Sequence, residues 1–188
     1  MLTVVPLTLT AARRHVHQHH SHLERPQGGL CAVGVADDGQ LACVAILSLP
    51  RARLLNGKAA EVIRVASDGT RHAASMCLAA ITRAGLALGY TRLVSSTLLG
   101  EAGTSYRAAG WRPVAIGGGG GEWSRDGRER DAAMQPGAKV RWETGPTAAW
   151  TTMNAEDLAD VDAFVRESVG RVVLSGRGET MPLFRESA

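Results

Sequence analysis

Histidines gather near the N-terminus of this 188-residue chain. Five of its six histidines are His15, His17, His19, His20 and His22. If a helix runs through them, positions 15, 19 and 22 follow an i, i+4, i+7 spacing and share one face. Imidazoles titrate near neutral pH, so they can move protons or bind a metal ion. No Asp or Cys neighbour completes a metal set, and we predict no metal site. An exposed histidine-rich helix without chemistry is the alternative.

A turn that leads straight into a helix lies at residues 68–75. Asp68-Gly69 ends a run of strand-forming residues, and the helix opens at Thr70, Arg71, His72, Ala73, Ala74 and Ser75. The first N–H groups of a helix have no partner within it and attract anions such as phosphate. Small side chains there let a ligand approach the backbone. The segment predicts a site for the phosphate groups of a ligand, with an ordinary strand-to-helix turn as the alternative.

Glu61 precedes this turn on the expected strand. A carboxylate there can take a proton from an incoming ammonium, directly or through water. Strand alternation predicts that Glu61, Ile63 and Val65 share one face. Glu61 can equally pair with Arg51 or Arg64, so a catalytic and a structural role both stay open.

A basic stretch follows five consecutive glycines at 117–121. It contains Trp123, Arg125, Arg128 and Arg130. Arginines next to an aromatic ring suit phosphate contacts and base stacking. The alternative is a solvated loop without a ligand.

The composition limits the class of protein. A hydrophobic content of 45% fits a globular chain, and only 4% of residues are aromatic, so the core must consist of Ala, Val, Leu and Ile. No apolar run reaches the roughly 18 residues that cross a bilayer, so we expect no membrane partner. Cys31, Cys43 and Cys77 are scattered and odd in number, which argues against a disulfide framework and favours a reduced, cytoplasmic setting.

The elements that must position these residues follow from periodicity. Residues 1–9 predict a strand, and Thr10 is placed to cap a helix that begins at residue 11. Runs at 30–36 and 41–49 predict a hairpin around the turn 37–40. Strand 59–66, helix 71–88 with Gly89 as its stop, and strand 92–96 form a central strand-turn-helix-strand unit with parallel strands. A short helix at 103–109 and strands at 113–116 and 139–143 bring the count to about seven strands.

A composition shift after Gly145-Pro146 predicts a second region. We expect residues 1–145 to form the main domain and residues 146–188 a helical extension, capped by Asn154, with a flexible tail. Residues 179–184 in that tail resemble the short peptide that bacterial replication proteins insert into the sliding clamp, without its usual Gln.

Two motifs resemble the GNAT superfamily of acyl-CoA N-acyltransferases. Val65 matches the end of the family's strand, and residues 70–75 take the phosphate-loop positions, with Thr70 in place of Gln/Arg and with Ala73 and Ser75 in place of glycines. Tyr106, followed by Gly110-Trp111, matches the family's Tyr-x-x-x-Gly-aromatic pattern. The resemblance covers about residues 2–143. It implies a mixed α/β GNAT-like sheet of six or seven strands, acetyl-CoA or another acyl-CoA as the cofactor, and Tyr106 as the acid that protonates the departing thiolate.

The resemblance also implies an acceptor wall. His19, His20 and His22 lie where the family builds it, and the proton acceptor is then Glu61 or His20. Arg64 and the basic stretch are further substrate-binding candidates.

A narrower resemblance concerns residues 19–22, residues 61–70, residues 101–105 and the basic stretch. These segments resemble a little-characterised GNAT-like family of phages and mobile elements. They are also distantly similar to Mom-type proteins, which modify adenine in DNA. Three functions therefore stay open: an N-acyltransferase with an unknown amine acceptor, a Mom-like enzyme acting on a nucleobase, and a non-catalytic module. Besides acyl-CoA, the candidate partners are nucleic acid, the sliding clamp and a second copy of the chain.

Overall fold

A single mixed sheet organises the chain. The computed structural model describes residues 1–19, 28–51, 55, 57, 59–117 and 139–148. Its seven strands lie in the order β1-β2-β3-β4-β5-β7-β6. They are β1 (Leu2–Leu7), β2 (Cys31–Asp37), β3 (Gln40–Ser48), β4 (Ala59–Ser67), β5 (Arg92–Leu98), β6 (Arg112–Gly117) and β7 (Lys139–Thr144). The predicted α/β class is confirmed, whereas the expected helix and tail of the C-terminal region lie outside the described residues.

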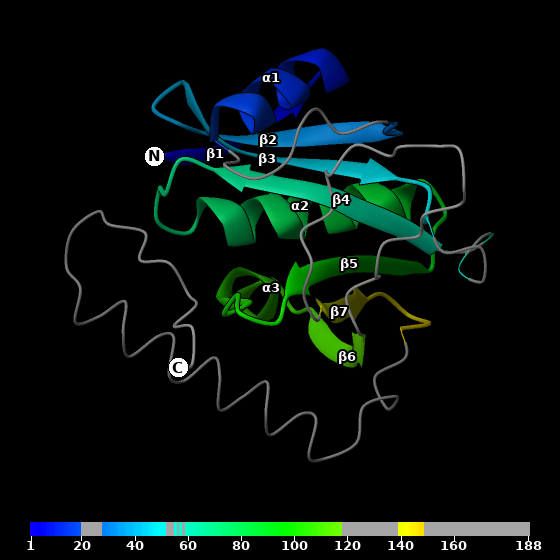
Figure 1. Ribbon diagram of the computed structural model, residues 1–188. Coiled ribbons are helices and arrows are strands. Elements are labelled where there is room, and N and C mark those ends of the chain that lie inside the picture. The colour runs from blue at the N-terminus through cyan, green and yellow to red at the C-terminus, as the bar shows by residue number, and fades with distance from the viewer. Residues whose placement is uncertain (20–27, 52–54, 56, 58, 118–138, 149–188) are drawn as a thin grey trace, which may run out of the picture.

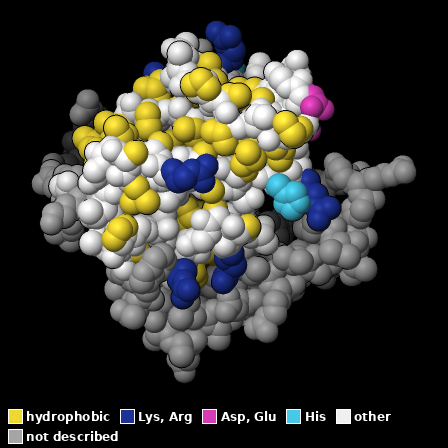
Figure 2. Space-filling model, turned by 180° about the vertical axis from the view of Figure 1, so that it is seen from behind, with side chains coloured by type: hydrophobic (Ala, Val, Ile, Leu, Met, Phe, Trp, Pro, Cys, Tyr) yellow, Lys and Arg dark blue, Asp and Glu magenta, His cyan; other side chains and the backbone are white. Residues whose placement is uncertain are grey.

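Helices cover both faces of the sheet (Figure 1). Helix α1 (Leu9–His19) packs on one face through Ala12 and Val16, which contact Val44 and Ile46 in one apolar cluster. Helix α2 (Ala73–Ala87) packs on the other face and buries Cys77, Leu78 and Ile81 in a larger cluster. Small aliphatic side chains dominate both layers, but Trp111 and Trp142 are also buried in the α2-side cluster, so the expectation of a core of Ala, Val, Leu and Ile alone is wrong. On the side opposite to this view, hydrophobic side chains are spread among isolated basic ones (Figure 2).

The local signals for most elements are confirmed. The hairpin turns at Asp38 and Gly39, whose φ angles of 45° and 83° suit a tight two-residue turn. Gly89 has a φ of 92° directly after the C-cap of α2, where its lack of a side chain permits the left-handed conformation. The cap of α1 differs from our prediction. The helix begins at Leu9, and Thr8 Oγ1, rather than Thr10, accepts a hydrogen bond from the Ala11 N–H at 3.2 Å.

Strands β4 and β5 pair over a short length and then separate. Their parallel ladder joins Ala59 to Arg92, Ala60 to Leu93 and Glu61 to Val94, and it ends there. Figure 1 shows the two strands diverging towards α3 (Thr104–Ala108). Beyond the ladder, no described strand pairs with β4 on its β5 side, and the Val62 carbonyl oxygen accepts a hydrogen bond from Ser95 Oγ instead. Backbone groups further along this edge can pair with a ligand.

A β-bulge in β4 changes which side chains share a face. Pairing with β3 joins Leu47 to Val62 and Ile46 to Arg64, so Ile63 is the extra residue. Val62 and Val65 both contact the α2-side cluster, whereas Ile63 belongs to the α1-side cluster. The prediction that Ile63 and Val65 share a face is therefore wrong, because the bulge interrupts the two-residue alternation.

Strand β7 lies between β5 and β6 and places a buried carboxylate in the sheet. Glu143 is fully buried and accepts hydrogen bonds from Arg92, one of them from Nε at 2.8 Å, while Arg141 Nε lies 3.1 Å from its Oε1. Burial of a carboxylate requires such partners, so this group ties β5 to β7. Among the described residues, no helix is long and apolar enough to cross a membrane.

Candidate active site

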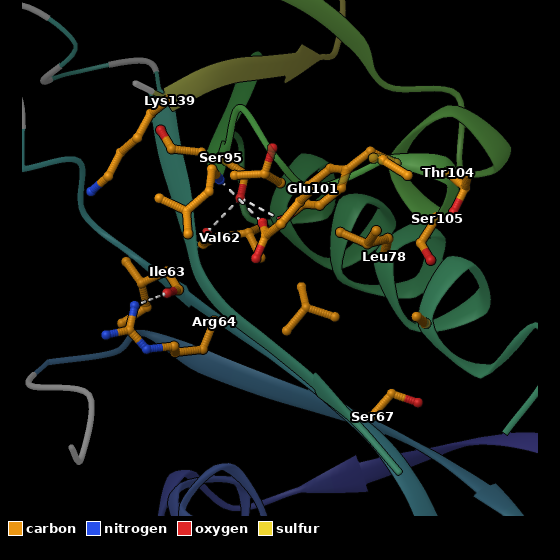
Figure 3. Close-up of a pocket in the computed structure, with 18 of the residues that line it drawn as sticks. Val62, Ile63, Arg64, Ser67, Leu78, Ser95, Glu101, Thr104, Ser105 and Lys139 are labelled. Atoms are coloured by element: carbon orange, nitrogen blue, oxygen red, sulfur yellow. Dashed lines mark hydrogen bonds between the residues drawn. The ribbon is translucent and has the colours of Figure 1, made fainter. Parts of the chain in front are cut away.

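A cleft of about 410 Å³ opens where β4 and β5 separate. This volume lies in the usual range for small-molecule sites. Strand β4 contributes residues 62–65 and Ser67, strand β5 contributes residues 95–98, and the loop into α3 contributes residues 101–106. Ala74 and Leu78 of α2 close one side, and Lys139 and Arg51 lie on the rim. Figure 3 shows Val62, Ser95 and Glu101 at the centre of the cleft, Leu78, Thr104 and Ser105 on one side, and Arg64 and Lys139 on the other.

Tyr106 reaches the point at which the strands part. Its hydroxyl oxygen lies 2.8 Å from Ser95 Oγ, and Ser95 Oγ donates to the carbonyl oxygen of Val62 at 2.9 Å. A serine hydroxyl has one proton. Because Ser95 uses that proton in its hydrogen bond to the Val62 carbonyl oxygen, the Tyr106 hydroxyl is the donor in its hydrogen bond to Ser95 Oγ. Burial raises the pKa of Tyr106 to about 12, although the Ser95 hydrogen bond opposes part of this rise. Tyr106 is therefore a neutral proton donor at physiological pH.

Two tryptophans hold the Tyr106 ring in place. The ring stacks on Trp142 with centroids 5.4 Å apart and meets the edge of Trp111 at 5.6 Å. Trp142 Nε1 donates to Thr97 Oγ1 at 3.0 Å, and Trp111 Nε1 donates to Thr82 Oγ1 at 3.1 Å. Buried rings with satisfied N–H groups have little freedom to move. The Tyr-x-x-x-Gly-Trp motif thus builds its own aromatic support for Tyr106.

The turn between β4 and α2 is shaped for close backbone approach. Asp68 Oδ1 accepts a hydrogen bond from the Thr70 N–H at 2.8 Å, and Gly69 and His72 have φ angles of 98° and 66°. His72 is thus the residue that adopts the left-handed conformation often occupied by glycine. Ala73 is fully buried, so its small size serves packing, whereas Ala74 lines the cleft. In the first turn of α2, the Ala73 N–H donates to the Thr70 carbonyl oxygen and the Met76 N–H to that of His72, whereas the N–H groups of Ala74 and Ser75 have no backbone acceptor among the described residues.

Most lining residues of the cleft were not predicted as site residues, and four of them bear on its chemistry. Ser95 orients Tyr106, and Glu101 places a carboxylate beside the same space (Figure 3). Glu101 Oε2 also accepts a hydrogen bond from the Leu98 N–H at 3.1 Å, which fixes the loop between β5 and α3. Arg51 and Lys139 come from loop and strand ends that are distant in sequence. The one available signal was Glu101, within a polar loop directly before the Tyr106 helix.

The predicted site residues fall into three groups. Val65, Ala74, Arg64 and Tyr106 line the cleft. Glu61 accepts a hydrogen bond from the Arg51 N–H at 2.9 Å and is not among the described residues that line the cleft. His19 stacks on the buried His15 with ring centroids 4.3 Å apart, on the α1 side of the sheet. The other predicted residues of the turn are described but are not among the lining residues of the cleft: Thr70, Arg71, His72, Ala73 and Ser75. The predictions at His20, His22, Trp123, Arg125, Arg128 and Arg130 lie outside the described residues.

Metal binding has no support in the described part of the chain. No group of three His, Cys, Asp or Glu side chains converges there in a way that suits a metal ion. The alternative metal set predicted from the histidine spacing includes His22, which lies outside the described residues.

Comparison with known proteins gives a fold-level match. No protein-family model matches the sequence, and no significant match is found among curated proteins. The ribosomal-protein-S18-alanine N-acetyltransferase of Escherichia coli matches with a TM-score of 0.54 at 14% identity, over 82% of this chain and 99% of that one. An acetyltransferase of Bacillus subtilis, solved in complex with CoA, gives 0.54 at 14% identity, over 77% and 97%. A GNAT-family acetyltransferase of Streptococcus pneumoniae gives 0.53 at 10% identity, over 77% and 99%.

These matches define the class of fold. The chain has the fold of the GNAT acetyltransferases, as the order of its elements predicts. At identities of 10 to 15%, the likeness concerns the arrangement of helices and strands and not the particular substrate. The phage-related and Mom-like resemblances stay predictions.

Proposed function

We propose that this protein transfers an acyl group from acyl-CoA to a primary amine. The observation that carries the proposal is the continuity of one cleft, which runs from the N-terminus of α2 to the Tyr106 hydroxyl. A cofactor with phosphate groups at one end and a thioester at the other suits such a path. The B. subtilis neighbour was solved with CoA, which supports the choice of cofactor.

The turn and the separated strand would hold the cofactor. The pyrophosphate would accept hydrogen bonds from backbone N–H groups at the start of α2, such as those of Ala74 and Ser75, since a helix N-terminus favours negative charge. The amides of the pantetheine arm would pair with the β5-facing backbone groups of β4 beyond Glu61, in the manner of an added strand. The thioester would then lie near Ser95 and Tyr106.

The reaction needs one nucleophile, one base and one leaving group. The amine nitrogen attacks the thioester carbonyl carbon, the C–N bond forms, and the C–S bond breaks to release CoA as a thiolate. Glu101, which lines the cleft, is our proposed acceptor for the amine proton. Tyr106 would donate a hydrogen bond to the thiolate sulfur. Because a phenol with a pKa of about 12 loses its proton reluctantly, stabilisation of the thiolate by this hydrogen bond matters more than complete proton transfer.

The choice of base changes relative to the sequence-based hypothesis. Glu61 and Glu101 each accept one backbone N–H, from Arg51 and from Leu98. Position supports Glu101, which lines the cleft, whereas Glu61 is not among the described lining residues. His20 lies outside the described residues and stays a candidate. Comparison of Glu101→Gln with Glu61→Gln separates these options. Loss of turnover at saturating acyl-CoA in the first variant alone supports Glu101, and the reverse pattern supports Glu61.

Release of CoA thiol tests the proposal. Acetyl-CoA is incubated with the protein and a panel of primary amines, and free thiol is measured together with the mass of the acylated amine. We expect amine-dependent thiol release that is lost with Tyr106→Phe. Thiol release that is identical with and without every amine, and no acylated product, would count against amine transfer. Nucleosides and DNA in the same panel examine the nucleobase acceptor, which otherwise rests on residues outside the described part of the chain.

A further inference from the structure

Positive charge gathers at one end of the cleft. Arg51, Arg64 and Lys139 line it, while Glu101 is the carboxylate among the described lining residues. None of these three cations forms an ion pair with a carboxylate in the described part of the chain. Glu61 of β4 is a nearby negative charge that acts on Arg64. The three cations outnumber Glu61 and Glu101, and an excess of positive charge at a cleft concentrates anionic ligands there.

Arg64 is anchored by one hydrogen bond, and its Nε–H group remains a donor for a ligand. Its Nη1 donates to the Ile63 carbonyl oxygen at 2.6 Å, which anchors the guanidinium to the bulge in β4. Its Nε is buried and has no hydrogen-bond partner among the described residues. A buried donor without a partner is costly, and a ligand oxygen that accepts its proton removes this cost. The planar guanidinium also matches the geometry of a carboxylate or a phosphate.

The cationic end differs from the end that suits the pyrophosphate. Figure 3 shows Arg64 and Lys139 on one side of the cleft and Leu78, Thr104 and Ser105 on the other, with Val62, Ser95 and Glu101 between them. Ala74, at the start of α2, lies next to Leu78 in the apolar layer on that second side. The cofactor and the cationic end can therefore be occupied together, with the acyl group between them.

We infer that the acceptor is a small primary amine that carries an oxyanion, either a carboxylate or a phosphate. The oxyanion binds Arg64 and Lys139, and the amine points towards Glu101 and Ser95. This inference rests on the proposed acyl transfer and adds the class of acceptor. The opposite charges of Glu101 and the Arg64–Lys139 pair match the two charges of such a molecule before its amine is deprotonated.

Matched pairs of amines test the inference. With acetyl-CoA held constant, kcat/KM is measured for β-alanine against β-alaninamide and for O-phosphoethanolamine against ethanolamine. We expect the anionic member of at least one pair to react at least tenfold faster, and the pair that shows the preference identifies carboxylate or phosphate. Equal or faster reaction of both neutral members overturns the inference.

Variants of Arg64 and Lys139 test whether these two residues cause the preference for anionic amines. Arg64→Gln and Lys139→Gln should each raise KM for the preferred anionic amine about tenfold and leave both the Kd of CoA and the KM of the neutral amine within about twofold. A tenfold weaker Kd for CoA in these variants would mean that the cations serve the cofactor, which also overturns the inference. Melting temperatures identify a variant that fails to fold, and Lys139→Gln, on the rim, then carries the test.

CoA binding by the unaltered protein distinguishes a failure of the proposed acyl transfer from a failure of the acceptor inference alone. If CoA does not bind, the proposed function fails with the acceptor inference. If CoA binds and neutral amines are acylated without charge preference, only the acceptor inference fails.

Discussion

The Tyr106 hydroxyl lies 2.8 Å from Ser95 Oγ, and Ser95 Oγ donates a hydrogen bond to the Val62 carbonyl oxygen. This pair joins α3 to β5 and β4 at the point where the two strands separate. In the resting protein the Tyr106 proton points to Ser95. When a thiolate develops beside it, Tyr106 can turn its proton to the sulfur, and Ser95 can then donate to the Tyr106 oxygen.

Removal of the Tyr106 hydroxyl should affect turnover more than binding. We expect Tyr106→Phe to lower kcat about 100-fold, as is usual when a positioned proton donor is removed, with the KM for acyl-CoA little changed. The stability cost should be near 1 kcal/mol, because one hydrogen bond is lost. Steady-state kinetics and urea unfolding measure the two effects. Tyr90→Phe is the control, and an equal kcat loss in that variant would remove the special role of Tyr106.

Ser95→Ala should give a smaller effect of the same kind. Tyr106 keeps its hydroxyl but loses the group that orients its proton and supports it in the transition state. We expect a kcat loss of about tenfold, in the range of a single modest hydrogen bond. A double variant with Tyr106→Phe should lose little more than Tyr106→Phe alone, because both changes act on one pathway. Fully additive losses would show that the two residues act separately.

The pH dependence of kcat follows from the raised pKa of Tyr106. The folded-state value of about 12 lies above the ordinary value near 10, so Tyr106 keeps its proton throughout the range of assay. We expect kcat to show no fall between pH 8 and 10. The same shift contributes stability that is present below about pH 10 and is lost as the pH rises towards 12. A decline of kcat with an apparent pKa near 9 that disappears in Tyr106→Phe would contradict this assignment.

Gly103 should be intolerant of a side chain. It adopts a φ of 62°, and a Cβ atom there would lie 2.2 Å from the Trp142 ring. We expect Gly103→Ala to destabilise the fold by about 1–3 kcal/mol and to lower kcat, because Trp142 supports the Tyr106 ring. Gly100→Ala is the matched control, since nothing lies within 4 Å of a Cβ at that position. Equal melting temperatures for both variants would contradict the proposed packing.

His15 should make the fold sensitive to acid. Burial lowers its pKa below the usual value near 6.5, the positive charge of nearby His19 lowers it further, and Asp68 partly opposes the shift. The unfolded chain then binds more protons than the folded chain, so stability falls as the pH drops through about 6.5. We expect His15→Phe to reduce the loss of melting temperature between pH 7.5 and 5.5, whereas the exposed His17→Gln should not. Equal losses in all three proteins would contradict this.

The sequence predicted the elements better than the site. Helix α2 and the hairpin follow from the spacing of apolar residues and from Asp-Gly and Gly89 signals, all of them local. The bulge at Ile63 depends on pairing with Ile46 and Leu47, so strand periodicity alone misplaced Val65. Glu101 and Lys139 meet at the cleft only because β7 inserts beside β5, which no local pattern records. His72 was predicted as part of the turn, but its left-handed conformation was not, because residues other than glycine rarely adopt it.

Titration calorimetry with CoA tests the central claim most directly. The cleft from the α2 N-terminus to Tyr106 predicts that one CoA binds per chain. A ligand that binds only the folded state increases the free energy of unfolding, by about 2.7 kcal/mol at a concentration of 100 times Kd, and so raises the melting temperature. Single-site binding, together with a rise in melting temperature that acetyl-CoA reproduces, is the predicted result. The absence of both heat and a melting shift at millimolar CoA and acetyl-CoA would contradict the account.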